Sequence, residues 1–472
     1  MKVLFAVHGY PPELVGGTES AVQALARGLA RSGVEVVVVA GSLAVAGEGR
    51  SVELSRDGDA DTGDGPPIRI VRLHRGDLHF DHWHKGSSPA VGRAFSALLE
   101  EERPDLVHVH HWIRLTGDLV ARGARAGLPA VVSLHDMWTT CLITFRVRLD
   151  TERFCDAPLA PRPCLACAGM LPPRTPWVPA ETAHLWLHRR RSTVARELSL
   201  ARAVVAPSAA HADAVERYLG LGEGSLGAAT VPPGRELELA RRAPLPPPAE
   251  HGRLVLGCWG HLLPLKGADV VVEALRALPD PGRVELRLAG GEPDRAFAER
   301  VRRAAEGLQV SFLGPYRAEE LDRHEVSAVH AMVSGTRAHE SWGLVLDEAL
   351  ALGLPAVLPR SGAFAERAGP WALTYEPCEP ADLARALARL LDEPGLWPGL
   401  LAALPSGPPE NGLEQHVSAH LELYERAVAA GPPEAPAAEW WVEGLQEREL
   451  AQWDRSFARH TPEQLGLGEA GA

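Results

Sequence analysis

The sequence predicts an α/β protein made of two doubly wound domains, each with a parallel sheet covered by helices on both faces. Short apolar runs alternate with helical segments through both halves of the chain, as in repeated strand–helix–strand units. Several runs, above all the Val-rich 34–40, show no polar alternation, which is typical of strands buried on both faces. The proline-rich stretch 243–249 separates the halves and is typical of an interdomain linker.

Each half supplies its own series of elements. In the first half we expect strands at 3–7, 34–40, 68–73, 106–110, 130–134 and 203–206, and helices at 16–31 and 184–200. The Asp- and Gly-rich segment 57–67 predicts a surface loop. In the second half we expect strands at 254–259, 284–289, 310–313, 329–333 and 356–358, and helices at 268–278, 295–307, 344–352 and 380–391.

Composition excludes some classes of partner. The formal net charge of the 472 residues is -13, which argues against nucleic acid as the main partner because phosphate binding needs a basic surface. The sequence has no run of about 18 apolar residues, so we expect no membrane-spanning helix. The apolar run at the N-terminus is too short for a signal peptide. We therefore expect a cytoplasmic enzyme.

The first chemical signal is the pair Gly16–Gly17, which follows the first strand and opens a helix. Glycines there let backbone amides approach an anion, and the helix N-terminus adds a favourable partial charge. The pattern is not Gly-x-Gly-x-x-Gly, so a nicotinamide cofactor is disfavoured. The alternative is a tight turn without a ligand.

Two further signals lie in the second half. Lys266 stands in the segment 260–267, after a strand and at the start of a helix, where its ammonium can reach a diphosphate; a solvated surface lysine is the alternative. Glu340 precedes a helix expected to begin near Gly343, and Glu348 lies in its first turns. These carboxylates can bind sugar hydroxyls and a ribose diol, or they are two surface acids of an ordinary helix.

Taken in this order, the three segments resemble glycosyltransferase family 4, retaining enzymes of the GT-B fold. Glu340 through Glu348 matches the Glu-x7-Glu signature of that family, 260–267 resembles its Gly-Arg-Leu-x-x-x-Lys-Gly segment, and Gly16–Gly17 matches its N-terminal loop. The resemblance covers about residues 1–430. Each segment is weak alone, but their combination is highly specific.

The resemblance implies a role for each matching residue. Gly16 and Gly17 would contact the donor diphosphate through their amides, and Lys266 would neutralise it. Glu340 would bind the donor hexose and Glu348 the ribose. The remaining positions implied by the resemblance are His135, at a strand end beside the transferred sugar, and the donor-lining Ser341, Trp342, Gly343 and Leu344.

The chain departs from the family pattern at His261, where the family has an arginine, so one permanent cation is lost at the diphosphate. Arg337 is a candidate replacement because it lies shortly before Glu340. The departure keeps alive a non-catalytic nucleotide-sugar-binding protein as an alternative. A sugar-nucleotide epimerase of similar architecture is the other alternative.

The resemblance further implies two Rossmann-like domains facing each other across a cleft. We expect an acceptor-side domain at 1–245, with a Cys-rich insert at about 138–180, and a nucleotide-sugar-binding domain at 250–410. A helix at 411–430 would return to the first domain, and an extension at 431–472 would follow. The implied reaction is retaining transfer of a hexose from a UDP- or GDP-type donor to a glycan, lipid-linked or small-molecule acceptor. No Asp-x-Asp motif with the right strand context stands out, so we expect that transfer requires no divalent metal.

Other features bear on the acceptor and on metals. The basic run 188–191 predicts either a solvated helix face or peripheral contact with an anionic membrane. The aromatic and polar segment 79–84 can stack on sugar rings. Four cysteines gather in one window (Cys141, Cys155, Cys164 and Cys167), and its last pair has the spacing of a structural zinc half-site. Four reduced thiols are the alternative, and an iron–sulfur cluster is a further option.

Overall fold

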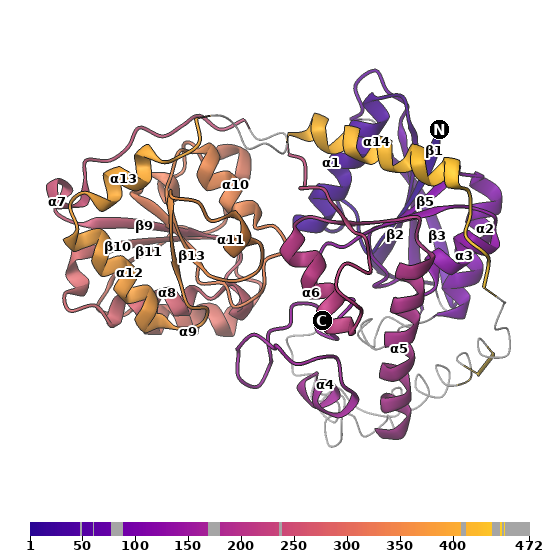
Figure 1. Ribbon diagram of the computed structural model, residues 1–472, viewed down its shortest axis with the longest axis horizontal. Helices are drawn as coiled ribbons and strands as arrows, with labels where there is room; N and C mark the ends of the chain where they lie inside the picture. The colour runs from indigo at the N-terminus through magenta and orange to yellow at the C-terminus, as the bar shows by residue number, and fades with distance from the viewer. Residues whose placement is uncertain are drawn as a thin grey trace.

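The computed structural model describes residues 1–47, 50–59, 61–76, 88–168, 180–235, 238–406 and 412–436, together with 444, 445 and 448. Figure 1 shows two lobes side by side, each with a central sheet between helices. The predicted fold class, two parallel-sheet α/β domains, is confirmed.

The N-terminal lobe holds an eight-stranded sheet in the order β3-β4-β2-β1-β5-β6-β7-β8. Its strands are β1 (Lys2–Val7), β2 (Glu35–Val45), β3 (Val52–Asp59), β4 (Ile68–Arg75), β5 (Leu106–Val109), β6 (Ala130–Ser133), β7 (Ala203–Ala206) and β8 (Ala229–Thr230). Its helices include α1 (Gly17–Arg31), α2 (Pro89–Glu102), α3 (Leu119–Arg125), α5 (Ala180–Leu200) and α6 (Ala209–Leu219).

One edge of this sheet differs from the prediction. Strand β3 runs antiparallel to β4 and takes in residues 57–59, which were expected to lie in a surface loop. Its side chains are mostly polar and exposed, as suits an edge strand, so the strand carries no apolar run for a sequence pattern to detect. The expectation of purely parallel sheets is therefore wrong at this edge.

The C-terminal lobe holds a six-stranded sheet in the order β11-β10-β9-β12-β13-β14, in which every pairing is parallel. Its strands are β9 (Leu254–Trp259), β10 (Val284–Ala289), β11 (Gln309–Phe312), β12 (Ala331–Val333), β13 (Ala356–Pro359) and β14 (Ala372–Tyr375). Its helices include α8 (Ala268–Arg276), α9 (Arg295–Ala305), α10 (Leu344–Ala351), α11 (Gly362–Arg367), α12 (Pro380–Asp392) and α13 (Leu396–Ala402). The edge strand β14 was not predicted.

Two connections complete the architecture. The linker between the lobes ends in the short helix α7 (Pro248–His251), and the Cys-rich insert between β6 and α5 carries α4 (Pro161–Cys167). After the second lobe, α14 (Leu413–Ala430) lies along the N-terminal lobe beside α1 (Figure 1). Its Val417 and Tyr424 are buried in the same apolar cluster as Leu25 of α1. Across the described residues, no helix combines the length and apolar character that a membrane crossing demands.

Candidate active site

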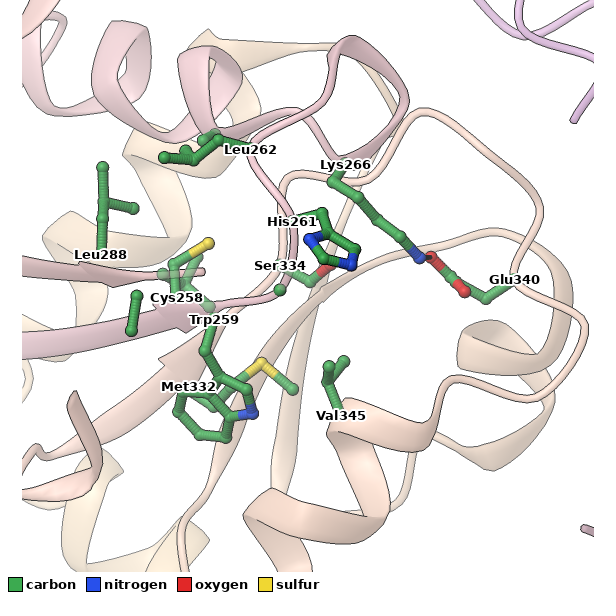
Figure 2. Close-up of a pocket in the computed structure, with 14 residues that line it drawn as sticks. Cys258, Trp259, His261, Leu262, Lys266, Leu288, Met332, Ser334, Glu340 and Val345 are labelled. Carbon is green, nitrogen blue, oxygen red and sulfur yellow. Dashed lines mark hydrogen bonds and ion pairs between the residues drawn. The ribbon is translucent and has the colours of Figure 1, made fainter. Parts of the chain in front are cut away.

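In both sheets the strand order reverses at one point, where doubly wound proteins bind ligands at the carboxyl ends of the strands. In the C-terminal lobe this point lies between β9 and β12. A cavity opens there, and Trp259, His261, Lys266, Glu340 and Val345 are among its lining residues (Figure 2). Three of the predicted donor-site residues therefore share one cavity.

Lys266 and Glu340 form the charged centre of this cavity. The Lys266 ammonium lies 2.7 Å from Glu340 Oε1, and the Thr336 hydroxyl donates to the same oxygen at 3.0 Å. Figure 2 shows the two side chains pointing toward each other from different loops. The Lys266 side chain is 40% exposed and that of Glu340 is 15% exposed, so the ammonium is accessible to a ligand.

The loop geometry around Lys266 differs in detail from the prediction. The residue ends a 3-10 turn, Pro264–Lys266, and the α-helix begins only at Ala268. Between them Gly267 has a φ of 64°, and a Cβ on Gly267 would lie 1.9 Å from the Gly335 carbonyl oxygen. The loops that contain Gly267 and Gly335 contact each other backbone to backbone, with no side chain between them. This contact fixes the distance between the segments that bear Lys266 and Glu340.

The segment from Ser341 to Leu344 forms the N-terminal entry to α10. Gly343 precedes the helix with a φ of 86°, and a Cβ there would lie 2.2 Å from the Phe364 ring. The Trp342 indole donates to Asp347 at 2.7 Å. Because this segment is held on both sides, the free amides of the first turn of α10 keep a fixed direction toward the site.

The same segment meets the N-terminal lobe. A Cβ on Gly17 would lie 3.5 Å from Leu344 Cδ1, and the Ser208 hydroxyl donates to the Ser341 carbonyl at 2.8 Å. The structure thus brings the Gly16–Gly17 loop against the start of α10. These two predicted parts of the diphosphate site come from opposite lobes.

Glu348 is placed differently from the expectation of an open carboxylate. It is 3% exposed, and its two oxygens accept from Arg235 Nη1 at 2.8 Å and from Trp259 Nε1 at 2.9 Å. Burial raises the pKa of Glu348, against the attraction of Arg235. A ribose hydroxyl would have to share or replace these donors. Sequence reasoning missed both partners, although Trp259 ends a predicted strand directly before the segment 260–267.

The suggestion that Arg337 replaces the missing family arginine is wrong. Its guanidinium makes two hydrogen bonds to buried Asp269, at 2.7 and 2.9 Å, and donates to the Pro264 carbonyl at 2.7 Å. Arg337 is buried against Asp269 and does not line the cavity of Lys266 and Glu340. It anchors the turn that ends at Lys266 instead. His261 is exposed and lines the cavity (Figure 2).

On the N-terminal side, His135 follows β6 at the predicted strand end. Its Nε2 lies 3.0 Å from Nδ1 of His110, which follows β5. Burial lowers the pKa of His135 to about 3, so the imidazole is neutral at pH 7 and serves as a hydrogen-bonding group rather than a cation. Both residues line a hollow in the N-terminal lobe that also includes Pro207 and Pro233.

A second polar group lies beside the Gly16–Gly17 loop. His8 Nε2 lies 2.7 Å from Glu19 Oε1, and His111 Nε2 lies 3.3 Å from Asp136 Oδ2. The His8 and His111 rings are 4.5 Å apart. Burial alone would raise the pKa of Asp136, but His111 holds it down at about 2, so Asp136 stays ionised. His8 and Glu19 were not predicted as site residues. They could have been found from their positions on either side of the loop after β1, at the switch point of the sheet.

The basic run 188–191 is exposed at His188 and Arg191 but not along its whole length. Arg190 is buried, donates to the Trp138 carbonyl and lies 4.3 Å from the centre of the Trp138 ring. Arg191 donates to the Leu219 carbonyl at the end of α6, at 2.9 Å. Both side chains thus have structural partners. The segment 79–84 and most of the extension 431–472 lie outside the described residues.

The four clustered cysteines are all free and line one cavity (Cys141, Cys155, Cys164 and Cys167). Among the described residues no three His, Cys, Asp or Glu side chains are arranged to hold a metal ion. The four thiols line the same cavity, but they are not arranged around a common metal position. A structural zinc stays a prediction.

Family models match both lobes. The model of Glycosyltransferase Family 4 matches residues 15–237, and that of Glycosyl transferases group 1 matches residues 253–393. The first covers the Gly16–Gly17 loop and His135. The second covers Lys266, Glu340 and Glu348.

Named relatives agree with these models. The chain is 31% identical over 224 residues to D-inositol 3-phosphate glycosyltransferase of Streptomyces bingchenggensis, across 42% of this chain and 48% of the relative. It is 28% identical over 371 residues to D-inositol 3-phosphate glycosyltransferase 1 of Catenulispora acidiphila, across 74% and 78%. It is 41% identical over 118 residues to a GDP-mannose-dependent phosphatidylinositol dimannoside mannosyltransferase of Mycobacterium tuberculosis, across 24% and 29%. The first of these matches thus spans about half of the relative.

Solved structures share the fold. An Anabaena protein, HepE, in complex with UDP and glucose has a TM-score of 0.57 at 16% identity, over 90% of this chain and 99% of that one. The catalytic domain of starch synthase IV from Arabidopsis thaliana, bound to ADP and acarbose, has a TM-score of 0.57 at 15% identity, over 90% and 99%. With two lobes of the GT-B type and family models matching each of them, the chain belongs to glycosyltransferase family 4.

Proposed function

We propose that this protein transfers a hexose from a nucleotide-sugar donor to a hydroxyl acceptor with retention of anomeric configuration. The observation that carries the proposal is the Lys266–Glu340 pair at the switch point of the C-terminal lobe, beside the free amides of α10. A cation, helix amides and a carboxylate in one cavity suit the diphosphate and the hydroxyls of a nucleotide sugar.

In this mechanism Lys266 and the first amides of α10 stabilise the negative charge that develops on the departing diphosphate. Glu340, released from Lys266 by the incoming diphosphate, accepts hydrogen bonds from the hexose. Neutral His135 orients the sugar from the N-terminal side. The acceptor hydroxyl attacks from the face that the nucleotide leaves, which retains the configuration.

Donor and acceptor follow from the relatives only as candidates. Some solved neighbours are complexes with UDP or UDP-glucose, and named relatives are described as GDP-mannose-dependent or as acting on D-inositol 3-phosphate. We propose a UDP- or GDP-hexose donor and a polyol, glycan or lipid-linked acceptor.

The test is transfer from UDP-glucose and GDP-mannose to a panel of such acceptors. Lys266→Ala and Glu340→Ala are each expected to lower turnover by about a hundredfold or more, since each removes a charged group positioned for the transition state. Both residues are at least partly exposed, so the variants should unfold at the wild-type denaturant concentration. Wild-type turnover in either variant would reject the assignment. Nucleotide-sugar binding without transfer to any acceptor would favour the non-catalytic alternative.

A further inference from the structure

The Cys-rich insert contains a small antiparallel turn of chain, residues 146–155, called the insert hairpin below. Val147 and Phe154 pair across it. At its base the Arg146 guanidinium lies 3.5 Å from the centre of the Tyr218 ring in α6. The insert hairpin is therefore anchored on the N-terminal lobe.

The second strand of the insert hairpin contacts the C-terminal lobe close to the base of the hairpin. The Phe154 ring stacks on the His339 ring, with centroids 3.6 Å apart and planes 10° from parallel. His339 directly precedes Glu340 in the chain. Burial lowers the pKa of His339 to about 4, so the stacked imidazole is neutral at pH 7.

A second contact reaches the loop that carries Lys266. Glu152 accepts two hydrogen bonds from Arg300, at 2.8 and 2.6 Å, and lies 3.8 Å from the Arg337 guanidinium. Arg337 in turn donates to the Pro264 carbonyl in the turn that ends at Lys266. The insert hairpin thus contacts the supports of both charged residues in the donor cavity.

These contacts join parts of the chain that belong to different lobes. In Figure 1 the purple loop beside α4 extends from the N-terminal lobe toward the C-terminal lobe. Arg153 adds an ion pair with Glu379, at 3.2 Å, from the same part of the hairpin. Because the hairpin stands on one lobe and the donor loops on the other, the contacts form only when the lobes are together.

We propose that the insert hairpin is a positioning element of the donor site, in which Phe154 and Glu152 hold the loops of Glu340 and Lys266 at their working separation across the cleft. The inference rests on the proposed function, because that proposal identifies the ligand of the site as a nucleotide sugar. It adds that a segment of the acceptor-side lobe sets the geometry of the donor-side pair. Neither residue touches the donor; each acts through a neighbour, His339 or Arg337.

The test compares three phenylalanine variants of the full chain. Phe154→Ala removes the stacked ring, and Phe154→Tyr keeps it. Phe145→Ala makes the same truncation in the same insert at a side chain that is 42% exposed. With UDP-glucose or GDP-mannose as the probe, Phe154→Ala is expected to raise the donor KM about tenfold, the size of effect of one lost aromatic pair, with a smaller change in kcat. Phe154→Tyr and Phe145→Ala should stay within about twofold of wild type.

Amide hydrogen exchange of residues 334–343, measured without ligand, separates this inference from the proposed function. Faster exchange there in Phe154→Ala, but not in Phe145→Ala, is expected whether or not the donor is correctly assigned. Unchanged exchange and unchanged donor KM in Phe154→Ala would overturn the inference while leaving the proposed function intact. Equal damage from Phe145→Ala would also overturn it, because the effect would then be general destabilisation of the insert. A wild-type protein that binds neither nucleotide sugar would reject the proposed function and the donor part of the inference, whatever the exchange result.

Discussion

At the residue scale, the cavity that holds Lys266 and Glu340 depends on backbone conformations that only glycine adopts easily. Gly343 enters α10 in the left-handed region, directly against the Phe364 ring. Gly267 and Gly335 meet backbone to backbone beneath Lys266. The polar residues of the motifs are therefore accompanied by glycines that let two loops approach each other. The sequence shows these glycines but not the loop that each one meets.

Gly343→Ala is expected to destabilise the protein by about 1–3 kcal/mol, because it combines a strained φ with a clash against Phe364. It should also weaken donor binding, since the amides of α10 change direction. Denaturant unfolding and nucleotide-sugar titration measure the two effects. Gly399→Ala in α13 is the matched control: nothing lies within 4 Å of its Cβ position, so stability should hold or rise slightly. Equal behaviour of the two variants would contradict this account of Gly343.

Single residues also mark the limit of the sequence signature. Lys266 and Glu340 were predicted from a motif and lie together in one cavity. Arg235 and Trp259, which hold Glu348, were missed because they come from distant segments that meet only in the fold. Arg337 was suggested as a replacement cation from its position shortly before Glu340, because its partner Asp269 is 68 residues away in the sequence.

At the scale of elements, the buried parallel strands and the edge strand β11 were predicted, whereas the edge strands β3, β8 and β14 were missed. Strands such as β1 and β9 are apolar on both faces, and this pattern alone locates them. Strands β3 and β14 have one neighbour each. Strand β3 is mostly polar and partly exposed, so no hydrophobic run marks it. Strand β14 is a four-residue, mostly apolar segment that was overlooked. The insert was recognised by its cysteines, but its contact with the other lobe depends on tertiary structure.

The cysteine cavity supports a prediction about metal content. Purified protein is expected to carry about one zinc per chain, bound by thiolates that turn toward one another within the cavity. Atomic absorption measures the zinc. Cys164→Ser should lower the content sharply, whereas Cys258→Ser in strand β9 should not. Metal-free wild-type protein with full stability would contradict the zinc interpretation and favour reduced thiols.

Helix α14 supports a prediction about acid stability, because it packs a histidine cluster against β5 and β6. Burial lowers the pKa of His416 to about 4 and that of His420 to about 3, and it lowers the pKa of His108 as well. The unfolded chain takes up these protons near pH 6.5 and the folded chain does not, so stability is full above that pH and falls as the pH drops. Burial raises the pKa of Glu197 to about 7, so the folded chain takes up one proton there before the unfolded chain does. This uptake offsets the effect of one histidine.

The free energy of unfolding is therefore expected to fall as the pH is lowered from 6.5 to 4.5. The fall is up to about 1.4 kcal/mol per pH unit for each histidine whose effect Glu197 does not offset. Urea titrations at several pH values give the slope. His420→Leu should reduce it by about one proton. A flat profile over this window would show that the cluster takes up its protons in the folded state.

At the scale of the whole molecule, the structure is a closed pair of lobes. Glu366 of α11 accepts from the amides of Ala209 and Ala210 at the start of α6, at 3.3 and 2.7 Å, across the junction. The Gly17–Leu344 approach and the insert hairpin close the same junction at other points. The resemblance to a family implied two facing domains, but the specific contacts that hold them together became visible only in the fold.

The measurement that tests the central claim most directly is proton NMR of the product during the first turnovers with UDP-glucose or GDP-mannose and an acceptor that supports transfer. Both donors carry an α-linked hexose, so the account predicts an α-linked product, formed only when acceptor is present and lost in Lys266→Ala. A β-linked product, or a hexose epimerised on its nucleotide without acceptor, would contradict it.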